Sequence, residues 1–210
     1  ERLSRRGHDV VWWASAFDHM QKRPLFADDR EIALNGYFRI RALTSRGYRK
    51  NISLGRYFDH LLLAEKMARQ FRAGTVPDLI IASMPDHWSA YQAVRYAVGR
   101  KIPVIVDVRD EWPDVFLKVF PAVMRPLLKH LLVADYLKVK YLLRNATGIL
   151  SMMEYMLSWA LTKAGREKTW RDKLFYLGSR YAVPPPDVSL PEKFSAMARK
   201  LNGQCVVTFI

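Results

Sequence analysis

The sequence predicts an α/β fold in which helices cover both faces of a parallel sheet. Short runs rich in valine, isoleucine and leucine alternate with longer segments of helical periodicity, and four such strand–helix units follow one another. The apolar runs are continuous and do not alternate with polar residues, as expected for strands buried on both faces. This order of elements is that of a Rossmann-like sheet.

The N-terminal part begins with the end of a helix and one strand. Gly7 suits the left-handed position that closes a helix, and the β-rich run 10–14 follows it. Residues 15–54 are polar, and we expect them to be irregular. From Arg56 onwards apolar residues recur every three or four positions, which predicts a helix that ends at Gly74.

The middle of the chain carries the alternation most clearly. "PDLIIASMPD" (77–86) predicts a buried strand followed by a loop, and "IPVIVDV" (102–108) predicts the next strand. The remaining predicted elements are a helix at 88–98, a long helix from Pro121 to Asn145, a strand at 147–151, a helix at 152–164 and a strand at 173–178.

A proline-rich stretch, "AVPPPDVSLP" (182–191), interrupts this rhythm. Three consecutive prolines form a stiff spacer, which predicts a domain boundary. We therefore expect one domain at 1–180, a linker with a short helix at 181–204, and the first strand of a second domain at 205–210. Because the chain starts within the end of a helix, we also expect it to be a fragment of a longer protein.

The composition narrows the possible partners. A formal net charge of +14 implies an anionic partner: nucleic acid, a lipid surface or phosphorylated small molecules. A single cysteine excludes an internal disulfide, and five scattered histidines give no metal-ligand spacing, so we expect no metal site. No apolar run is long enough for a spanning helix, which predicts a soluble or peripheral protein.

The strand at 102–108 ends in a dense cluster of charge, at the edge where open parallel sheets bind ligands. Arg109 suits a bidentate contact with phosphate or carboxylate, and Asp110 can accept a proton or bind a hydroxyl. Trp112 offers a flat apolar face on which sugars and bases stack. An alternative of equal weight is that Arg109 forms a structural ion pair with Asp107 or Asp110 that orders the loop.

The loop Ser83–His87 lies at the same edge. His87 can bind an anion at the start of the next helix, where the helix dipole assists. For Asp86 we favour a simpler role, which is to cap that helix. His19, which lies near Lys22 in the sequence, is a further candidate for contact with an acceptor.

A basic stripe runs along the predicted helix 121–145. On a helical wheel four cations fall within an arc of about 100°, and Val133 and Tyr136 lie in the same arc. This mixture suits an anionic lipid interface or a nucleic-acid backbone, and the alternative is a solvated outer face. The predicted membrane-facing residues are Arg125, Lys129, Tyr136, Lys140 and Arg144.

Five stretches together resemble bacterial sugar transferases of glycosyltransferase family four. They are "LSRRGHDVVWWASAFDH", "PDLIIASMPD", "VIVDVRDEWPDVF", "ILSMMEYMLSWALTKAGR" and "LFYLG", and they occur in the family's order over nearly the whole chain. "RGHDV" is common to many Rossmann-like proteins, whereas "DVRDEWPD" after a buried strand is much more specific. The subgroup that the chain resembles builds O-antigen, capsule and other exopolysaccharides.

The resemblance implies the N-terminal, acceptor-binding half of a GT-B fold, in a fragment without the first strand and most of the second domain. It implies a retaining, metal-independent glycosyltransferase that uses a UDP-linked or related nucleotide sugar and needs no further cofactor. The acceptor would be a saccharide or a polyprenyl-diphosphate-linked sugar at the inner face of the plasma membrane. Asp110 would lie near the reacting centre beside Arg109, and Ser83, Asp86 and His87 would line the acceptor side.

Two other functions are compatible with the residues. A nucleotide-sugar epimerase needs a Tyr-x-x-x-Lys pair, which Tyr136 and Lys140 provide, although Lys140 belongs to the basic stripe. A nucleic-acid-binding module would explain the charge, but the aromatic residues have the spacing of a helical core rather than of a stacking platform.

Overall fold

The computed structural model describes residues 1–51, 53–84, 86–176 and Glu192. The chain divides into two units, Glu1–Tyr176 and Leu177–Ile210, and the described fold is that of the first. Apart from Glu192, the predicted linker at 181–204 lies outside the described residues, as does the predicted strand at 205–210.

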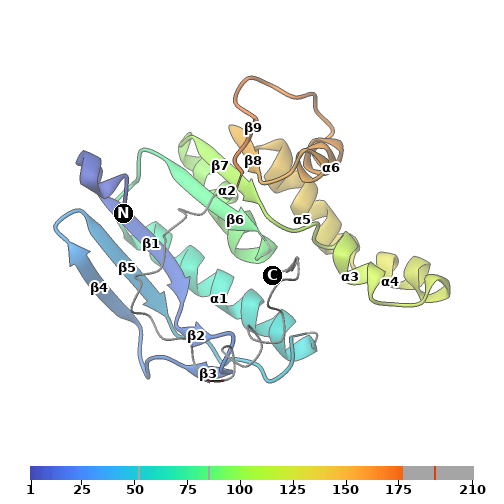
Figure 1. Ribbon diagram of the computed structural model, residues 1–210, viewed down its shortest axis with the longest axis horizontal. Coiled ribbons are helices and arrows are strands. Elements are labelled where there is room, and N and C mark those ends of the chain that lie inside the picture. The colour runs from blue at the N-terminus through green and yellow to red at the C-terminus, as the bar shows by residue number, and fades with distance from the viewer. Residues whose placement is uncertain (52, 85, 177–191, 193–210) are drawn as a thin grey trace. The chain divides into compact units, whose positions relative to one another are not determined.

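The larger sheet has four strands, which are all parallel (Figure 1). Its order follows the sequence: β6 (Ile80–Met84), β7 (Val104–Val108), β8 (Gly148–Ser151) and β9 (Lys173–Leu174). The helices between these strands include α2 (His87–Arg100), α5 (Val133–Arg144) and α6 (Glu154–Ala164). The predicted α/β class and its parallel sheet are therefore confirmed.

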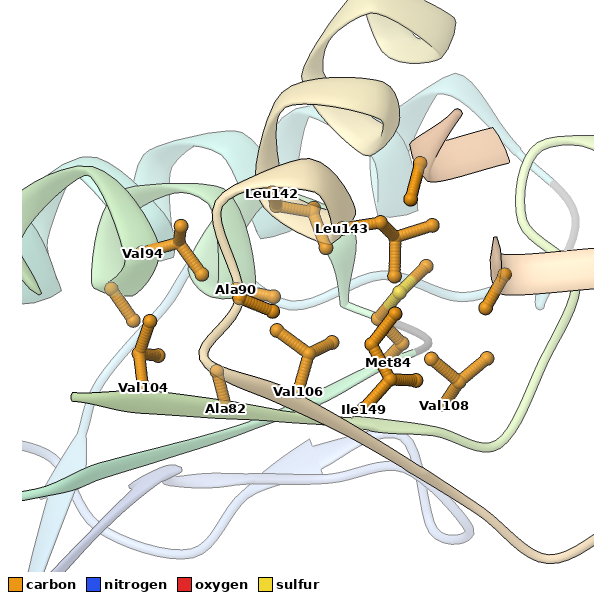
Figure 2. Close-up of a cluster of buried hydrophobic side chains, with 14 of the residues drawn as sticks. Ala82, Met84, Ala90, Val94, Val104, Val106, Val108, Leu142, Leu143 and Ile149 are labelled. Carbon is orange, nitrogen blue, oxygen red and sulfur yellow. The ribbon is translucent and has the colours of Figure 1, made fainter. Parts of the chain in front are cut away.

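The core lies between this sheet and its helices (Figure 2). Every second strand residue points into it, so that Val104, Val106 and Val108 are buried against apolar side chains of α2 and α5. The opposite face is more open, and the side chain of Ile81 is 53% exposed. The prediction of helices on both faces thus holds for one face within the described part of the chain.

A second sheet joins the strand predicted at 10–14 to two strands from residues that were expected to be irregular. β1 (Val10–Ser15) pairs in parallel with β5 (Phe38–Leu43), which pairs antiparallel with β4 (Arg30–Asn35). Two short strands, β2 (Phe17–Asp18) and β3 (Arg23–Pro24), form a separate antiparallel pair. The prediction of an irregular 15–54 segment was wrong. β4 is mostly exposed and polar, so it lacks the apolar run by which buried strands are recognised.

Helix α1 (Leu54–Ala73) connects the two sheets, and it confirms the helix predicted from Arg56. The Ser53 side chain caps its first turn by accepting the backbone N–H of Arg56. On its inner side the ring of Phe71 contacts Trp13 of β1 and Tyr96 of α2. The predicted helix end near Gly7 is a 3-10 turn, η1 (Ser4–Arg6), which Gly7 closes with a φ of 84°.

The single helix predicted from Pro121 to Asn145 is broken into several pieces. They are η2 (Ala122–Met124), α4 (Arg125–Leu131) and α5, and a short helix that was not predicted, α3 (Asp114–Lys118), precedes them. Pro126 stands in the first turn of α4, where a proline starts a helix, and the chain turns again at Leu132. None of the helices in the described ranges is long and apolar enough to cross a membrane.

Candidate functional site

The loops that follow β1, β5 and β6 meet at one edge of the fold. His19 Nδ1, after β1, lies 2.6 Å from the hydroxyl of Tyr48, which follows β5. The rings of Tyr48 and His60 are 6.1 Å apart, and His60 Nδ1 lies 3.6 Å from Asp86, after β6. Since these loops all follow the carboxyl ends of strands, this is the edge at which the sequence predicts ligand binding.

The ring of Tyr48 is the centre of a cationic and aromatic group that we call the Tyr48 cluster. The ammonium of Lys22 lies 4.9 Å from the ring centroid, and the guanidinium of Arg56 lies 5.6 Å from it. The members of the cluster are His19, Lys22, Tyr48, Arg56 and His60.

Buried Asp59 on α1 positions the loop that carries Tyr48. Its carboxylate accepts the backbone N–H of Gly47 at 2.6 Å and the hydroxyl of Ser45 at 3.1 Å. Gly47 has a φ of +73°, and a Cβ at this position would overlap the ring of Phe17. The loop therefore needs glycine here, both for its backbone angle and for the close approach of Phe17.

The two permanent cations of the Tyr48 cluster form no ion pair among the described residues. Lys22 donates to the side-chain oxygen of Asn51, and Arg56 donates to the Asn51 carbonyl at 3.0 Å. Partial burial of His19 lowers its pKa, and the positive charges of Lys22, Arg56 and His60 lower it further. Cations held beside an aromatic ring, with neutral oxygens as their partners, suit an anionic ligand that also has a ring or apolar face.

The charged loop after β7, in contrast, neutralises much of its own charge. Arg109 Nε donates to Asp107 at 2.7 Å, and the hydroxyl of Ser83 donates to the same carboxylate at 3.2 Å. The structural ion pair considered for Arg109 is therefore present. Asp110 accepts the backbone N–H of Glu111 at 2.8 Å and is half-buried at the sheet edge.

His87 lies inside the fold, and Trp112 is partly buried beside it. His87 is 3% exposed, and its Nε2 lies 2.6 Å from Asp135, so it has no face for the anion predicted there. The ring of Trp112 stacks on His87 at 5.3 Å and contacts Phe116 at 5.4 Å. Because these rings cover it, Trp112 packs beneath the site instead of offering an open platform to a sugar.

Asp86 has the capping role favoured for it. Its carboxylate accepts the backbone N–H of Ser89 at 3.2 Å and the Ser89 hydroxyl at 2.6 Å. Burial acts to raise the pKa of Asp86, but His60 and the bonds from Ser89 outweigh it and lower this pKa below its usual value. Asp86 is therefore ionised at neutral pH and fixes both α2 and His60.

Asp114 holds together three helices next to the site. Its carboxylate accepts Trp159 Nε1 at 2.8 Å, Lys163 Nζ at 2.6 Å and the hydroxyl of Tyr136. Burial acts against ionisation of Asp114, yet these three donors lower its pKa. Burial and Asp114 together raise the pKa of Tyr136 well above its usual value.

This contact corrects two predictions for Tyr136. The residue points inward to Asp114 and does not belong to a membrane-facing stripe, although Arg125, Lys129, Lys140 and Arg144 are exposed. Tyr136 also does not fit the Tyr-x-x-x-Lys pair of an epimerase, because its hydroxyl is bound to Asp114 and Lys140 is exposed on the surface of α5.

Sequence reasoning missed the roles of Tyr48, Arg56 and His60. The available signal was the composition of "SRGYRKNISLGR" (45–56), a basic loop with one tyrosine that precedes a capped helix. Nothing in the sequence brings this loop to His19, because the contact depends on how β5 pairs with β1.

The described residues contain no group of three or more histidine, cysteine or acidic side chains placed to hold a metal ion. Comparison of the chain with protein-family models gave no match, and comparison with curated protein sequences gave none either.

Proposed function

We propose that this chain is the acceptor-binding half of a retaining glycosyltransferase that builds cell-surface polysaccharide. The donor is a nucleotide sugar, UDP-linked or related, which a second domain of the whole protein binds. The acceptor is a saccharide or a sugar linked to a polyprenyl diphosphate. The resemblance of "DVRDEWPD" to family-four transferases supports this proposal, together with the parallel sheet in which that motif follows β7.

The observation that carries the proposal is the Tyr48 cluster at the carboxyl edge of the fold. A diphosphate-linked sugar offers the two features that the cluster can recognise, a multiply charged anion and the apolar face of a sugar ring. Lys22 and Arg56 supply the cations, and Tyr48 supplies the ring. His19 lies within hydrogen-bond distance of Tyr48 and completes the polar side of the site.

Asp110 and Arg109 are the residues we propose next to the reacting centre. Asp110 forms no ion pair among the described residues, so its carboxylate is available to a hydroxyl of the acceptor. Arg109 is half exposed, with Asp107 holding its Nε. Stabilisation of the leaving diphosphate requires further donors, which the family places in the second domain. The 210-residue chain alone should therefore not transfer sugar.

The strand edges support the finer assignment to a GT-B half. Among the described strands β1 pairs only with β5, and β6 pairs only with β7. Each of these edge strands also carries an apolar side chain that is exposed on a face of its sheet, Trp12 in β1 and Ile81 in β6. Buried parallel sheets do not normally leave such edges unpaired, so we propose that a further parallel strand of the whole protein joins them.

The proposed location is the inner face of the plasma membrane, with the protein bound peripherally. The net charge of +14 and the exposed cations Arg125, Lys129, Lys140 and Arg144 favour an anionic lipid surface. A nucleic-acid partner is the alternative that the same charge permits. The cations of the Tyr48 cluster lie over a single tyrosine ring, and the neighbouring rings of His19 and His60 are tilted against it rather than stacked in a row, which favours the sugar acceptor.

The test is binding of farnesyl-diphosphate-linked N-acetylglucosamine to the 210-residue chain, measured by calorimetry in a neutral detergent. We expect saturable binding that Arg56→Ala weakens by at least tenfold, because a charge-assisted hydrogen bond contributes about 1.5–3 kcal/mol. Arg69→Ala, on the exposed surface of the same helix, is the matched control and should bind like the original chain.

Two results would reject the proposal. One is an equal loss of binding in the Arg56 and Arg69 variants, which would mean that only overall charge matters. The other is tighter binding to a single-stranded oligonucleotide than to the lipid-linked sugar at the same ionic strength.

A further inference from the structure

A run of exposed apolar side chains lies between α3 and α5 in the described fold. We call Val119–Val133 the apolar arm; it contains η2 and α4. Neither η2 nor α4 has a buried residue, and α4 packs mainly against its neighbours in sequence. Figure 1 shows α3 and α4 reaching away from both sheets. The strongly exposed apolar residues of the arm are Val119, Val123, Leu127, Leu131 and Val133.

The apolar residues and the cations of α4 lie on opposite sides of the helix. Leu127 and Leu131 are four residues apart, so they share one face. Arg125 and Lys129 are also four apart, and at 100° per residue they lie about 160–200° from Leu127. This is the arrangement of a helix that lies in the plane of a membrane interface, with apolar side chains in the acyl region and cations at the head groups.

The charges of the arm and its surroundings define the kind of surface it fits. Between Asp114 and Asp135 the sequence contains no acidic residue, whereas it has Lys118, Arg125 and Lys129. Lys118 is paired with Glu111, but Lys129 forms no ion pair within the described ranges. A protein partner would be expected to bury few unpaired cations at the centre of such an interface. An anionic bilayer offers both the apolar layer and the matching charge.

We propose that the apolar arm inserts Val123, Leu127 and Leu131 into the interface of an anionic membrane. This inference rests on the membrane partner in the proposed function, and it names the element and the mode of contact. Insertion at the arm would hold the carboxyl edge of the sheet close to the lipid, because α3 joins the arm directly to the loop after β7. The acceptor site would then receive its lipid-linked sugar from the same surface.

The test is flotation of the 210-residue chain with vesicles of phosphatidylcholine and phosphatidylglycerol. Leu127→Gln with Leu131→Gln should weaken binding about tenfold to a hundredfold, since each change removes a leucine from the acyl region without changing the charge. The matched control is Leu34→Gln with Leu62→Gln, which alters two exposed leucines outside the arm and should leave binding unchanged.

A fluorescent reporter separates insertion from adsorption. In a Cys205→Ser background, an environment-sensitive dye on Leu127→Cys should shift its emission to the blue on vesicle binding, whereas the dye on Leu34→Cys should not. Equal vesicle binding by the two double variants would overturn the inference, as would equal binding to pure phosphatidylcholine vesicles. So would arm-dependent dimers in sedimentation with no vesicle binding, which would assign the arm to a second copy of the chain.

These outcomes are independent of the transferase proposal. Acceptor binding in neutral detergent needs no bilayer, so it can fail while the arm still inserts. Conversely, the arm can fail to insert while Arg56 still binds the acceptor.

Discussion

The Tyr48 cluster and the interior of the parallel-sheet half hold their charges in opposite ways. In the interior, Asp135 binds His87 and Tyr57, and Asp172 binds Arg166, all within the fold. In the cluster, Lys22 and Arg56 bind neutral oxygens and lie beside a ring. Charges that are satisfied internally contribute to stability, whereas cations without a carboxylate are available to a ligand. Substitutions in the interior should therefore lower stability, whereas substitutions in the cluster should lower ligand affinity.

The largest effect should come from Asp135, which is 1% exposed. Asp135→Ala leaves the buried His87 nitrogen and the Tyr57 hydroxyl without their acceptor, which should lower the free energy of unfolding by about 3 kcal/mol. Urea denaturation measures this loss. Arg109→Ala removes an exposed pair and should change stability by less than about 1 kcal/mol. A larger loss for Arg109 than for Asp135 would reverse the comparison.

The double change Lys22→Ala with Arg56→Ala should show the opposite pattern. We expect pyrophosphate affinity at neutral pH to fall by at least about a hundredfold, because two charge-assisted contacts of about 1.5–3 kcal/mol each are lost. The urea midpoint should stay close to that of the original chain, since neither cation forms an ion pair among the described residues. Loss of stability without loss of affinity would show that these cations are structural.

Acid should destabilise the chain through its internally bound carboxylates. Hydrogen bonds from Lys66 and Thr44 outweigh burial and lower the pKa of Asp29 to about 2, and Arg166 with Thr169 likewise lowers the pKa of Asp172. A carboxylate with a lowered folded-state pKa stabilises the fold above its unfolded value, and this contribution is lost as pH falls from about 5 towards the folded pKa. Asp29→Asn should remove roughly 1 kcal/mol of this acid-dependent stability. Denaturation midpoints between neutral pH and pH 3 measure how steeply stability falls with pH. If Asp29 were unpaired in solution, the Asp29→Asn variant would show the same pH dependence as the original chain.

Gly47→Ala tests how far the cluster depends on its loop. The left-handed backbone costs about 1–2 kcal/mol for alanine, and the new Cβ displaces Phe17. Pyrophosphate affinity should fall several-fold as Tyr48 moves. Gly165→Ala is the matched control, because Gly165 also has a positive φ but a Cβ added there would meet nothing within 4 Å. Equal affinities in the two variants would mean that the Tyr48 loop adjusts freely.

The smallest effect should be a pH dependence of anion binding. Partial burial and the neighbouring cations lower the pKa of His19, and a bound anion would raise it, so that binding takes up a proton. Sulfate does not titrate in this range, and its affinity should increase a few-fold as pH falls below the ordinary histidine pKa of 6.5. His19→Gln should remove this pH dependence of sulfate affinity. NMR titrations with sulfate at several pH values measure the affinity of both chains. An unchanged profile in the variant would exclude His19 from the site.

The parallel-sheet core could be predicted from the sequence more completely than the parts of the fold around it. Strands β6, β7 and β8 are short, mainly apolar runs, and their inward-facing side chains are buried against the helices, which is the burial that such runs predict. The β4–β5 hairpin was missed, although Asn35-Gly36 is a strong turn signal between two alternating segments. The broken helix at 121–145 was missed because its apolar periodicity continues through Leu132, where only the backbone shows the turn.

Sequence alone determined the α/β class, the position of the charged loop at a strand end, and the excess of cations, because periodicity and composition are local properties. Tertiary structure decided which charges remain available to a ligand. It buried His87, packed Trp112 against it, paired Arg109 with Asp107, and brought Lys22 and Arg56 to one ring. The physical reason is that the availability of a charge depends on its neighbours in space, which strand pairing and helix packing select from distant parts of the chain.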